Sequence, residues 1–213
     1  MNRYDYIIWD FNGTLLDDVM TGIRSVNTLL SESGLAVIES VEQYRGVFRF
    51  PIIEYYRTLG FDFHKEPYEV LAPKWVELYL ENVKTAGLYS DVKETLDLVA
   101  RQGIKQTVLS ATELDMLKGQ LEGLGISSYF EEVLGLDNIH AGSKLSLAHY
   151  WRDRHADARV LFVGDTDHDV QTARAMGADC VLISRGHQSG DYLHTMGVEV
   201  FEDLGGVRNI VKK

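Results

Sequence analysis

The sequence predicts an α/β fold, a Rossmann-like parallel sheet interrupted by an all-helical insert. The first observation is that, after Gly87, short apolar runs alternate regularly with amphipathic stretches of helical spacing. The second is a single strand-like run at residues 4–9, followed by a long region without a convincing strand pattern. The third is that two of the apolar runs end in aspartate, at Asp10 and Asp165.

The N-terminal elements follow from local patterns. Residues 4–9 predict a buried strand, because the run is short, aromatic and β-branched and is bounded by charged residues. Residues 17–33 predict a helix that ends at Gly34, because apolar residues recur there on one stripe. The pair Asn12-Gly13 could instead mark a β-hairpin, but the helical spacing that follows it argues against a hairpin.

A helical insert is expected at residues 16–86, inside a core domain formed by residues 1–15 and 87–213. Residues 40–86 have helical patterns throughout, and Pro51 suits the first turn of a helix. Because the insert begins directly after the Asp10 turn, we expect it to cover the C-terminal edge of the sheet, as a lid does.

The rest of the core is expected to alternate between helices and strands. Glycines at 103 and 177 are placed to end two of the helices. The expected order is helix 91–102, strand 105–110, helix 112–124, a short strand near 133–134, helix 144–155, strand 159–163, helix 167–176, strand 180–183, strand 198–201 and a final helix.

Composition restricts the class of protein. The 213 residues suffice for a core domain with an insert, and 45% hydrophobic with 25% charged residues is typical of a soluble globular protein. A net charge of −11 argues against a nucleic-acid partner. No apolar run reaches the length of a membrane span, and the N-terminus lacks the apolar core of a signal peptide. The single cysteine, Cys180, allows no intrachain disulfide, so we expect a cytoplasmic protein.

The strand-terminal aspartates suggest a metal site. Parallel strands that end in Asp10 and Asp165 would bring both carboxylates to one edge of the sheet. Asp167 and Asp169 follow, although acidic residues in the first turn of a helix are also favoured by the helix dipole alone. Clustered carboxylates repel one another unless a cation lies among them. A set of oxygen ligands suits Mg²⁺, which is the expected cofactor.

Two further motifs have a functional and a structural interpretation. Ser110 ends a predicted strand, where its hydroxyl could bind a phosphate oxygen. Alternatively, Ser110 or Thr112 only caps the following helix. Lys144, at the end of Gly142-Ser143-Lys144, could reach an anionic substrate, or it is a solvated surface lysine. The residues alone leave both choices open.

Taken in order, these segments resemble the haloacid dehalogenase-like superfamily, and within it the phosphoglycolate phosphatase-like group with a helical (C1-type) cap. The resemblance implies that Asp10 is the nucleophile, Ser110 a phosphate-binding hydroxyl and Lys144 the lysine that neutralises phosphate. It also implies that Mg²⁺ is held by Asp10, the main-chain carbonyl of Asn12 and Asp165, with Asp169 in support. The proline usual after the lysine is replaced by Leu145.

The function implied by the resemblance is a Mg²⁺-dependent phosphatase of a small phosphorylated metabolite, phosphoglycolate- or sugar-phosphate-like, that works through an aspartyl-phosphate. A dehalogenase is disfavoured, since that branch does not need the Asp165 metal site. No protein partner is indicated.

Arg45 and Arg49 could clamp a substrate carboxylate or a second phosphate, or they lie on a helix surface. His187 is a candidate proton-transfer group. The expected substrate contacts are Gly13, Thr14, Ala111, Arg45, Arg49 and His187.

Asn12 departs from the family pattern, which has an aspartate there that protonates the leaving oxygen and then activates water. An amide does not perform this proton transfer, which typically contributes about 10²–10⁴-fold to the rate. Three interpretations stay open. The protein is a slow phosphatase, or one whose substrates have good leaving groups; it is a catalytically impaired, phospho-ligand-binding or regulatory protein; or deamidation of the Asn12-Gly13 pair supplies the aspartate in some molecules.

Overall fold

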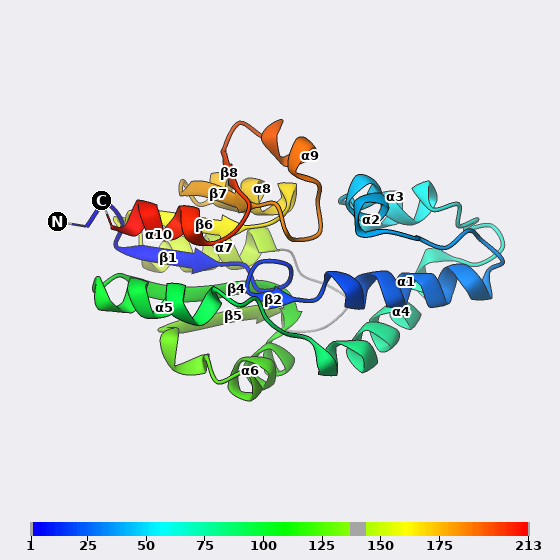
Figure 1. Ribbon diagram of the computed structural model, residues 1–213, viewed down its shortest axis with the longest axis horizontal. Coiled ribbons are helices and arrows are strands. Elements are labelled where there is room, and N and C mark those ends of the chain that lie inside the picture. Colours follow the sequence, from blue (N-terminus) through cyan, green and yellow to red (C-terminus); the bar gives the residue numbers. More distant parts are fainter. Residues whose placement is uncertain (1, 137–143, 213) are drawn as a thin grey trace.

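The computed structural model describes residues 2–136 and 144–212 (Figure 1). Its main feature is a six-stranded sheet with the strand order β5-β4-β1-β6-β7-β8, in which every neighbouring pair is parallel. The strands are β1 Tyr6–Trp9, β4 Lys105–Glu113, β5 Glu132–Leu136, β6 Val160–Gly164, β7 Asp179–Ile183 and β8 Glu199–Phe201. The predicted α/β class with a Rossmann-like parallel sheet is therefore confirmed.

Helices cover both faces of this sheet. They are α5 Val92–Arg101, α6 Leu114–Gly123, α7 Lys144–Arg154, α8 Asp167–Ala175, α9 Gly190–His194 and α10 Gly205–Val211, with a short 3-10 turn η2 at Ser127–Tyr129. Side chains of β1 alternate between the two faces, as the pleat of a strand requires. Ile7 and Trp9 pack in one cluster with α5, α6 and α10, whereas Tyr6 and Ile8 pack in another with α7 and α8. Both faces are apolar, which is why β1 is an uninterrupted hydrophobic run.

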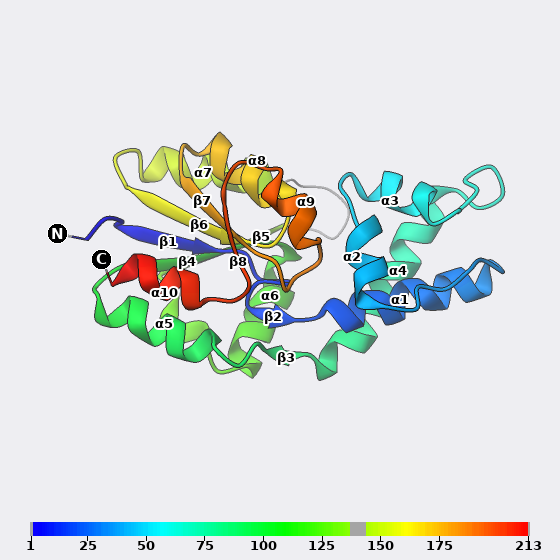
Figure 2. The same cartoon turned by 45° about the horizontal axis from the view of Figure 1, so that its top comes forward.

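The helical segment, residues 19–82, lies beyond the C-terminal ends of the strands, at the opposite end of the molecule from the chain termini (Figures 1 and 2). It contains α1 Val19–Glu32, α2 Val41–Val47, α3 Ile52–Thr58 and α4 Tyr68–Asn82, and the 3-10 turn η1 Val83–Thr85 follows it. Its buried residues, among them Leu30, Tyr44 and Tyr56, form an apolar cluster distinct from those on the sheet.

Two very short strands join the helical segment to the rest of the chain. β2 Leu16–Asp17 and β3 Gly87–Leu88 pair antiparallel, so the chain leaves the core and returns to it side by side. Strands of two residues have no detectable alternation, and the sequence did not predict them. The β2 pairing also explains why α1 begins at Val19 instead of residue 17.

β1 does not form a hairpin through Asn12-Gly13. Its partners on the two sides are β4 and β6, and both pairings are parallel. Within the described ranges, no helix combines the length and the apolar character that crossing a membrane requires.

Candidate active site

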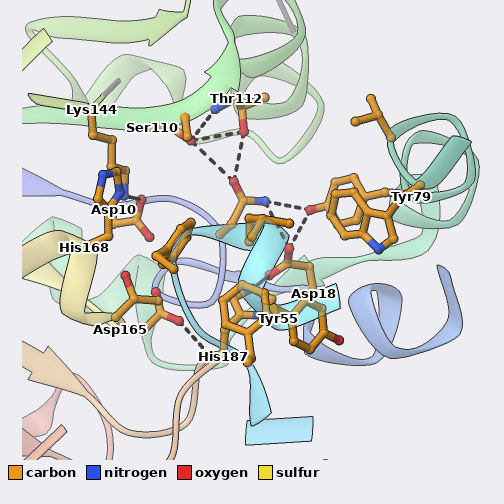
Figure 3. Close-up of a pocket in the computed structure, with 18 of the residues that line it drawn as sticks. Asp10, Asp18, Tyr55, Tyr79, Ser110, Thr112, Lys144, Asp165, His168 and His187 are labelled. Carbon is orange, nitrogen blue, oxygen red and sulfur yellow. Dashed lines mark hydrogen bonds and ion pairs between the residues drawn. The ribbon is translucent and has the colours of Figure 1, made fainter. Parts of the chain in front are cut away.

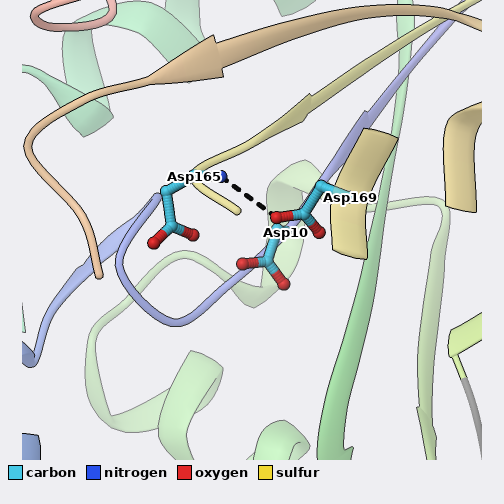
Figure 4. Close-up of side chains that lie close together, drawn as sticks. All are labelled: Asp10, Asp165 and Asp169. Atoms are coloured by element: carbon cyan, nitrogen blue, oxygen red, sulfur yellow. Dashed lines mark hydrogen bonds between the residues drawn. The ribbon is translucent and has the colours of Figure 1, made fainter. Parts of the chain in front are cut away.

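Three aspartates converge at the C-terminal edge of the sheet (Figure 4). Asp10 follows β1, Asp165 follows β6, and Asp169 lies in the first turn of α8. All three are buried, and one carboxylate oxygen from each lies within 4.8 Å of the others. The Asp10 main-chain N–H donates to the Val163 carbonyl at 2.8 Å, which fixes the end of β1 against β6. The juxtaposition predicted from the strand ends is therefore present.

Lys144 is part of the same cluster. Its side chain is only 6% exposed, and its ammonium forms ion pairs with Asp10 and, at 2.7 Å, with Asp169. A solvated surface lysine does not describe this geometry. Gly142 and Ser143, which precede it in the predicted motif, lie outside the described residues.

The carboxylate cluster has more negative charge than Lys144 balances. Burial raises the pKa of Asp10 well above its usual range, and the neighbouring aspartates add to the effect against the opposing charge of Lys144. Burial likewise raises the pKa of Asp165 to about 6. At Asp169 burial is outweighed by Lys144 and by donors from Thr166, so its pKa is lowered. A divalent cation among these oxygens would neutralise the excess charge, so the donor set fits Mg²⁺.

Two loops pack closely against the Asp165 side chain. Thr14 donates its hydroxyl to one Asp165 carboxylate oxygen at 3.1 Å, and the His187 main-chain N–H donates to the other at 2.7 Å. Gly13, with φ +73°, and Gly186 both lie so close that a Cβ atom at either position would collide with the Asp165 carboxylate. Only glycine allows both loops to hold this side chain at once.

Gly186→Ala is expected to weaken divalent-metal binding at the cluster by about 10–100-fold, because the added Cβ would displace the Asp165 carboxylate against which this loop packs. Isothermal titration calorimetry with Mg²⁺ measures the effect. Gly87→Ala is the matched control, since a Cβ there meets no atom within 4 Å. Unchanged affinity in Gly186→Ala would show that the loop does not position Asp165.

The Asn12 side chain is held by four hydrogen bonds. Its Nδ2 donates to Asp18 Oδ2 at 3.0 Å and to the Tyr79 hydroxyl at 2.7 Å. Its Oδ1 accepts from the Thr112 hydroxyl at 2.9 Å and from the Ser110 hydroxyl at 3.4 Å. In Figure 3 Ser110 and Thr112 lie on one side and Asp18 and Tyr79 on the other. Donors and acceptors are thus matched to an amide at this position.

Asp18 is a site residue that sequence reasoning missed. The carboxylate is buried and accepts from the Gly13 main-chain N–H at 2.8 Å and from the Tyr79 hydroxyl. It also lies 3.2 Å from His187 Nε2, while Nδ1 of the same ring contacts the Tyr44 hydroxyl at 2.9 Å. Burial by itself lowers the pKa of His187. The Asp18 carboxylate more than offsets this effect, so the pKa is raised to about 9. His187 is therefore a charged partner of Asp18.

Ser110 and Thr112 do not cap a helix. β4 continues to Glu113, and α6 begins only at Leu114. The cap is the Glu113 carboxylate, which accepts from the main-chain N–H groups of the next turn, at Asp115 and Met116. The hydroxyls of Ser110 and Thr112 are consequently available to the Asn12 amide and to the cavity that they line.

The two arginines expected to clamp a substrate lie elsewhere. Arg45 donates to the main-chain carbonyls of Gly186, at 2.8 Å, and Arg185. Arg49 donates to main-chain carbonyls of its own helix region and lies 3.7 Å over the Tyr192 ring. Neither is among the described residues that line the cavity. Sequence spacing could not show that the loop carrying His187 holds Arg45, or that Arg49 lies over the Tyr192 ring.

A cavity of about 270 Å³ lies between the carboxylate cluster and the helical segment (Figure 3). Its floor includes Asp10, Asn12, Ser110, Lys144 and Asp165, and Ala111 and His187 also line it. Gly13 and Thr14, expected as substrate contacts, are not among the described lining residues: Thr14 donates to Asp165, and Gly13 lies close against the Asp165 carboxylate. The residues predicted to bind phosphate therefore lie around one cavity.

Comparisons with known proteins agree with this geometry. A family model of haloacid dehalogenase-like hydrolases matches residues 7–183. A phosphoglycolate phosphatase from Pseudomonas syringae pv. syringae is 27% identical over 193 residues, with 86% of this chain and 71% of that protein covered. One from Nitrosococcus oceani is 28% identical over 226 residues, with 100% and 99% covered.

Solved structures share the fold. The crystal structure of a predicted phosphoglycolate phosphatase from Haemophilus somnus superposes with a TM-score of 0.76 at 21% identity, covering 99% of both chains. A haloacid dehalogenase-like hydrolase from Streptococcus pneumoniae gives 0.76 at 19% identity, covering 97% of this chain and 98% of that one.

Proposed function

The chain belongs to the haloacid dehalogenase-like hydrolases, and from this premise we propose that it is a Mg²⁺-dependent phosphatase of a small phosphorylated metabolite. The observation that carries the proposal is the buried cluster of Asp10, Asp165 and Asp169 paired with Lys144 beside a cavity. The relatives named phosphoglycolate phosphatase support phosphate-ester hydrolysis as the reaction class.

The proposed reaction has two steps at phosphorus. A carboxylate oxygen of Asp10 attacks in line, and the bond from phosphorus to the leaving alcohol oxygen breaks. Water then attacks the aspartyl-phosphate, which releases inorganic phosphate and restores Asp10. The Asn12 amide has no acidic proton to give, so the leaving oxygen takes its proton from water.

The surrounding residues supply charge and orientation. Mg²⁺, held by Asp10, the Asn12 main-chain carbonyl and Asp165, would supply a fixed positive charge to the phosphoryl oxygens. Asp169 lies behind this set: its Oδ2 accepts from the Asp165 and Thr166 N–H groups at 3.1 and 2.9 Å. Lys144 stays charged, since the aspartates raise its pKa above the usual range despite burial. With Ser110, it stabilises the transferring phosphoryl group.

We also propose that residues 16–86 act as a cap over a core domain of residues 1–15 and 87–213. The apolar cluster of the helical segment and its contribution of cavity-lining residues such as Phe48 and Trp75 support this division. The two connections pair with each other as β2 and β3.

Phosphate release from p-nitrophenyl phosphate tests the proposal, because this good leaving group needs little acid assistance. We expect release that requires Mg²⁺, stops with EDTA and resumes when Mg²⁺ is added. Asp165→Asn should raise the Mg²⁺ concentration needed for half-maximal release. We expect an effect greater than the roughly 10–100-fold that is typical when a residue supporting a metal ligand is changed. The exposed Asp153→Asn is the control.

Two results would contradict the phosphatase proposal. One is release that is indifferent to EDTA. The other is the absence of release by protein that still binds Mg²⁺ and phosphate. This result would favour a phospho-ligand-binding protein, in which the Asn12 amide, with its donors and acceptor already hydrogen-bonded, has no catalytic task.

A further inference from the structure

The cavity has two chemically different ends. The end at the sheet has Asp10, Lys144 and Asp165, which Figure 3 places together and away from Tyr79. The end formed by the helical segment is apolar and largely aromatic. Its lining includes Phe48, Phe50, Ile52, Tyr55, Trp75 and Val76.

The two cationic groups of the described lining are both paired with carboxylates: Lys144 lies at the sheet end, and His187, which packs 5.3 Å from the Phe48 ring, is paired with Asp18. Among the described residues that line the cavity, Lys144 is the single lysine or arginine, and its ammonium is paired with Asp10 and Asp169. The other charged groups of the lining include the carboxylates of Asp18 and Glu113. A second anionic group on a substrate would therefore lie among aromatic rings and would find no unpaired cation among the described residues, since His187 is already engaged by Asp18; this is costly for a carboxylate.

The aromatic side chains form a wall of two packed groups. The Phe48 ring lies 5.1 Å from that of Tyr55 and 5.6 Å from that of Phe50, both in edge-to-face geometry. Trp75 stacks on Tyr79 with ring centroids 5.0 Å apart. These spacings are those of favourable aromatic pairs, so a further ring can join the wall in the same geometry.

A buried polar atom of the wall lacks a hydrogen-bond partner within the described ranges. The Tyr55 hydroxyl is buried and has no hydrogen-bond partner among residues 2–136 and 144–212. A buried hydroxyl without a partner is unfavourable.

We propose that the substrate is a phosphate monoester of an alcohol that bears an uncharged aromatic group, with the ring against Phe48, Tyr55 and Trp75. The inference rests on the proposed phosphatase function and narrows its substrate class. A cavity of about 270 Å³ is just below the roughly 300–1,000 Å³ of sites for drug-sized ligands. It therefore suits an ester with one ring. Phosphoglycolate, whose carboxylate would occupy the aromatic end, is disfavoured.

Three esters of primary alcohols with similar leaving-group acidity test the proposal: ethyl, phenethyl and carboxyethyl phosphate. With wild-type protein and Mg²⁺, kcat/KM for phenethyl phosphate should exceed that for carboxyethyl phosphate by about 10²-fold or more. Ethyl phosphate should lie between them. Phosphoglycolate should behave like carboxyethyl phosphate.

A new cation at the aromatic end should reverse this preference. Val76 lies on α4 and lines the cavity. Val70 lies on the same helix, but its side chain is 46% exposed and is not among the described lining residues. Val76→Arg should change the ratio of kcat/KM values by at least about 10-fold in favour of carboxyethyl phosphate, by pairing its carboxylate. Val70→Arg, the matched control, should leave the ratio unchanged.

The outcomes separate the two proposals. A preference for carboxyethyl phosphate or phosphoglycolate over phenethyl phosphate overturns the aromatic substrate class and leaves the phosphatase function intact. An unchanged ratio in Val76→Arg, with the protein folded, also overturns it. Absence of hydrolysis of every ester, p-nitrophenyl phosphate included, overturns both.

Discussion

Asn12→Asp is expected to raise the turnover of alkyl phosphates by on the order of 10²-fold or more, the usual contribution of general acid–base catalysis. In the wild type, Asn12 Nδ2 lies 3.0 Å from Asp18 Oδ2. A carboxylate in that position would share a proton with Asp18, which raises the pKa of the pair. The new side chain would then hold a proton near neutral pH and could deliver it to a leaving oxygen.

The gain should depend on the leaving group. Steady-state kinetics should show a large increase for ethyl phosphate and a smaller one for p-nitrophenyl phosphate, whose leaving oxygen needs less protonation. Asn12→Ala is the matched variant, since it removes the amide without supplying an acid. If Asn12→Asp is no faster than wild type, both the proton-transfer argument and the deamidation interpretation fail.

Asp10→Asn is expected to reduce turnover by at least about 10⁴-fold, because an amide cannot form the covalent intermediate. The substitution removes one buried negative charge from a cluster that contains three. The variant should therefore still fold in the absence of metal, which a urea denaturation curve can verify. Asp17→Asn, an exposed carboxylate of β2, is the control with unchanged kinetics. Turnover in Asp10→Asn above a few per cent of wild type would assign the nucleophile elsewhere.

The predictions that succeeded depend on local pattern. Uninterrupted apolar runs before Asp10 and Asp165 predict buried parallel strands, and parallel strands bring their ends to one edge. The resemblance added Lys144, and the structure places its ammonium within that cluster. Their roles in catalysis remain proposals.

The residues that were missed interact across long sequence separations. Asp18 and Tyr79 meet at Asn12 although they are 61 residues apart. Nothing in the pattern of α4 distinguishes Tyr79 from its other apolar positions. The partners of the two arginines are of the same kind: Arg45 is held by the main chain of residues 185 and 186, and Arg49 lies over the Tyr192 ring. Partners of this kind are fixed by tertiary packing, which no local periodicity encodes.

The most direct test is the mass of the protein during turnover. Asn12 leaves the second step, hydrolysis of the aspartyl-phosphate, without a base, so this intermediate should accumulate. Wild-type protein mixed with p-nitrophenyl phosphate and Mg²⁺, then quenched in acid, should gain one phosphoryl group, located on the peptide that contains Asp10. A burst of nitrophenol matching the enzyme concentration should accompany it. Turnover without a burst and without phosphate on Asp10, or with the phosphoryl group on another residue, would contradict the account.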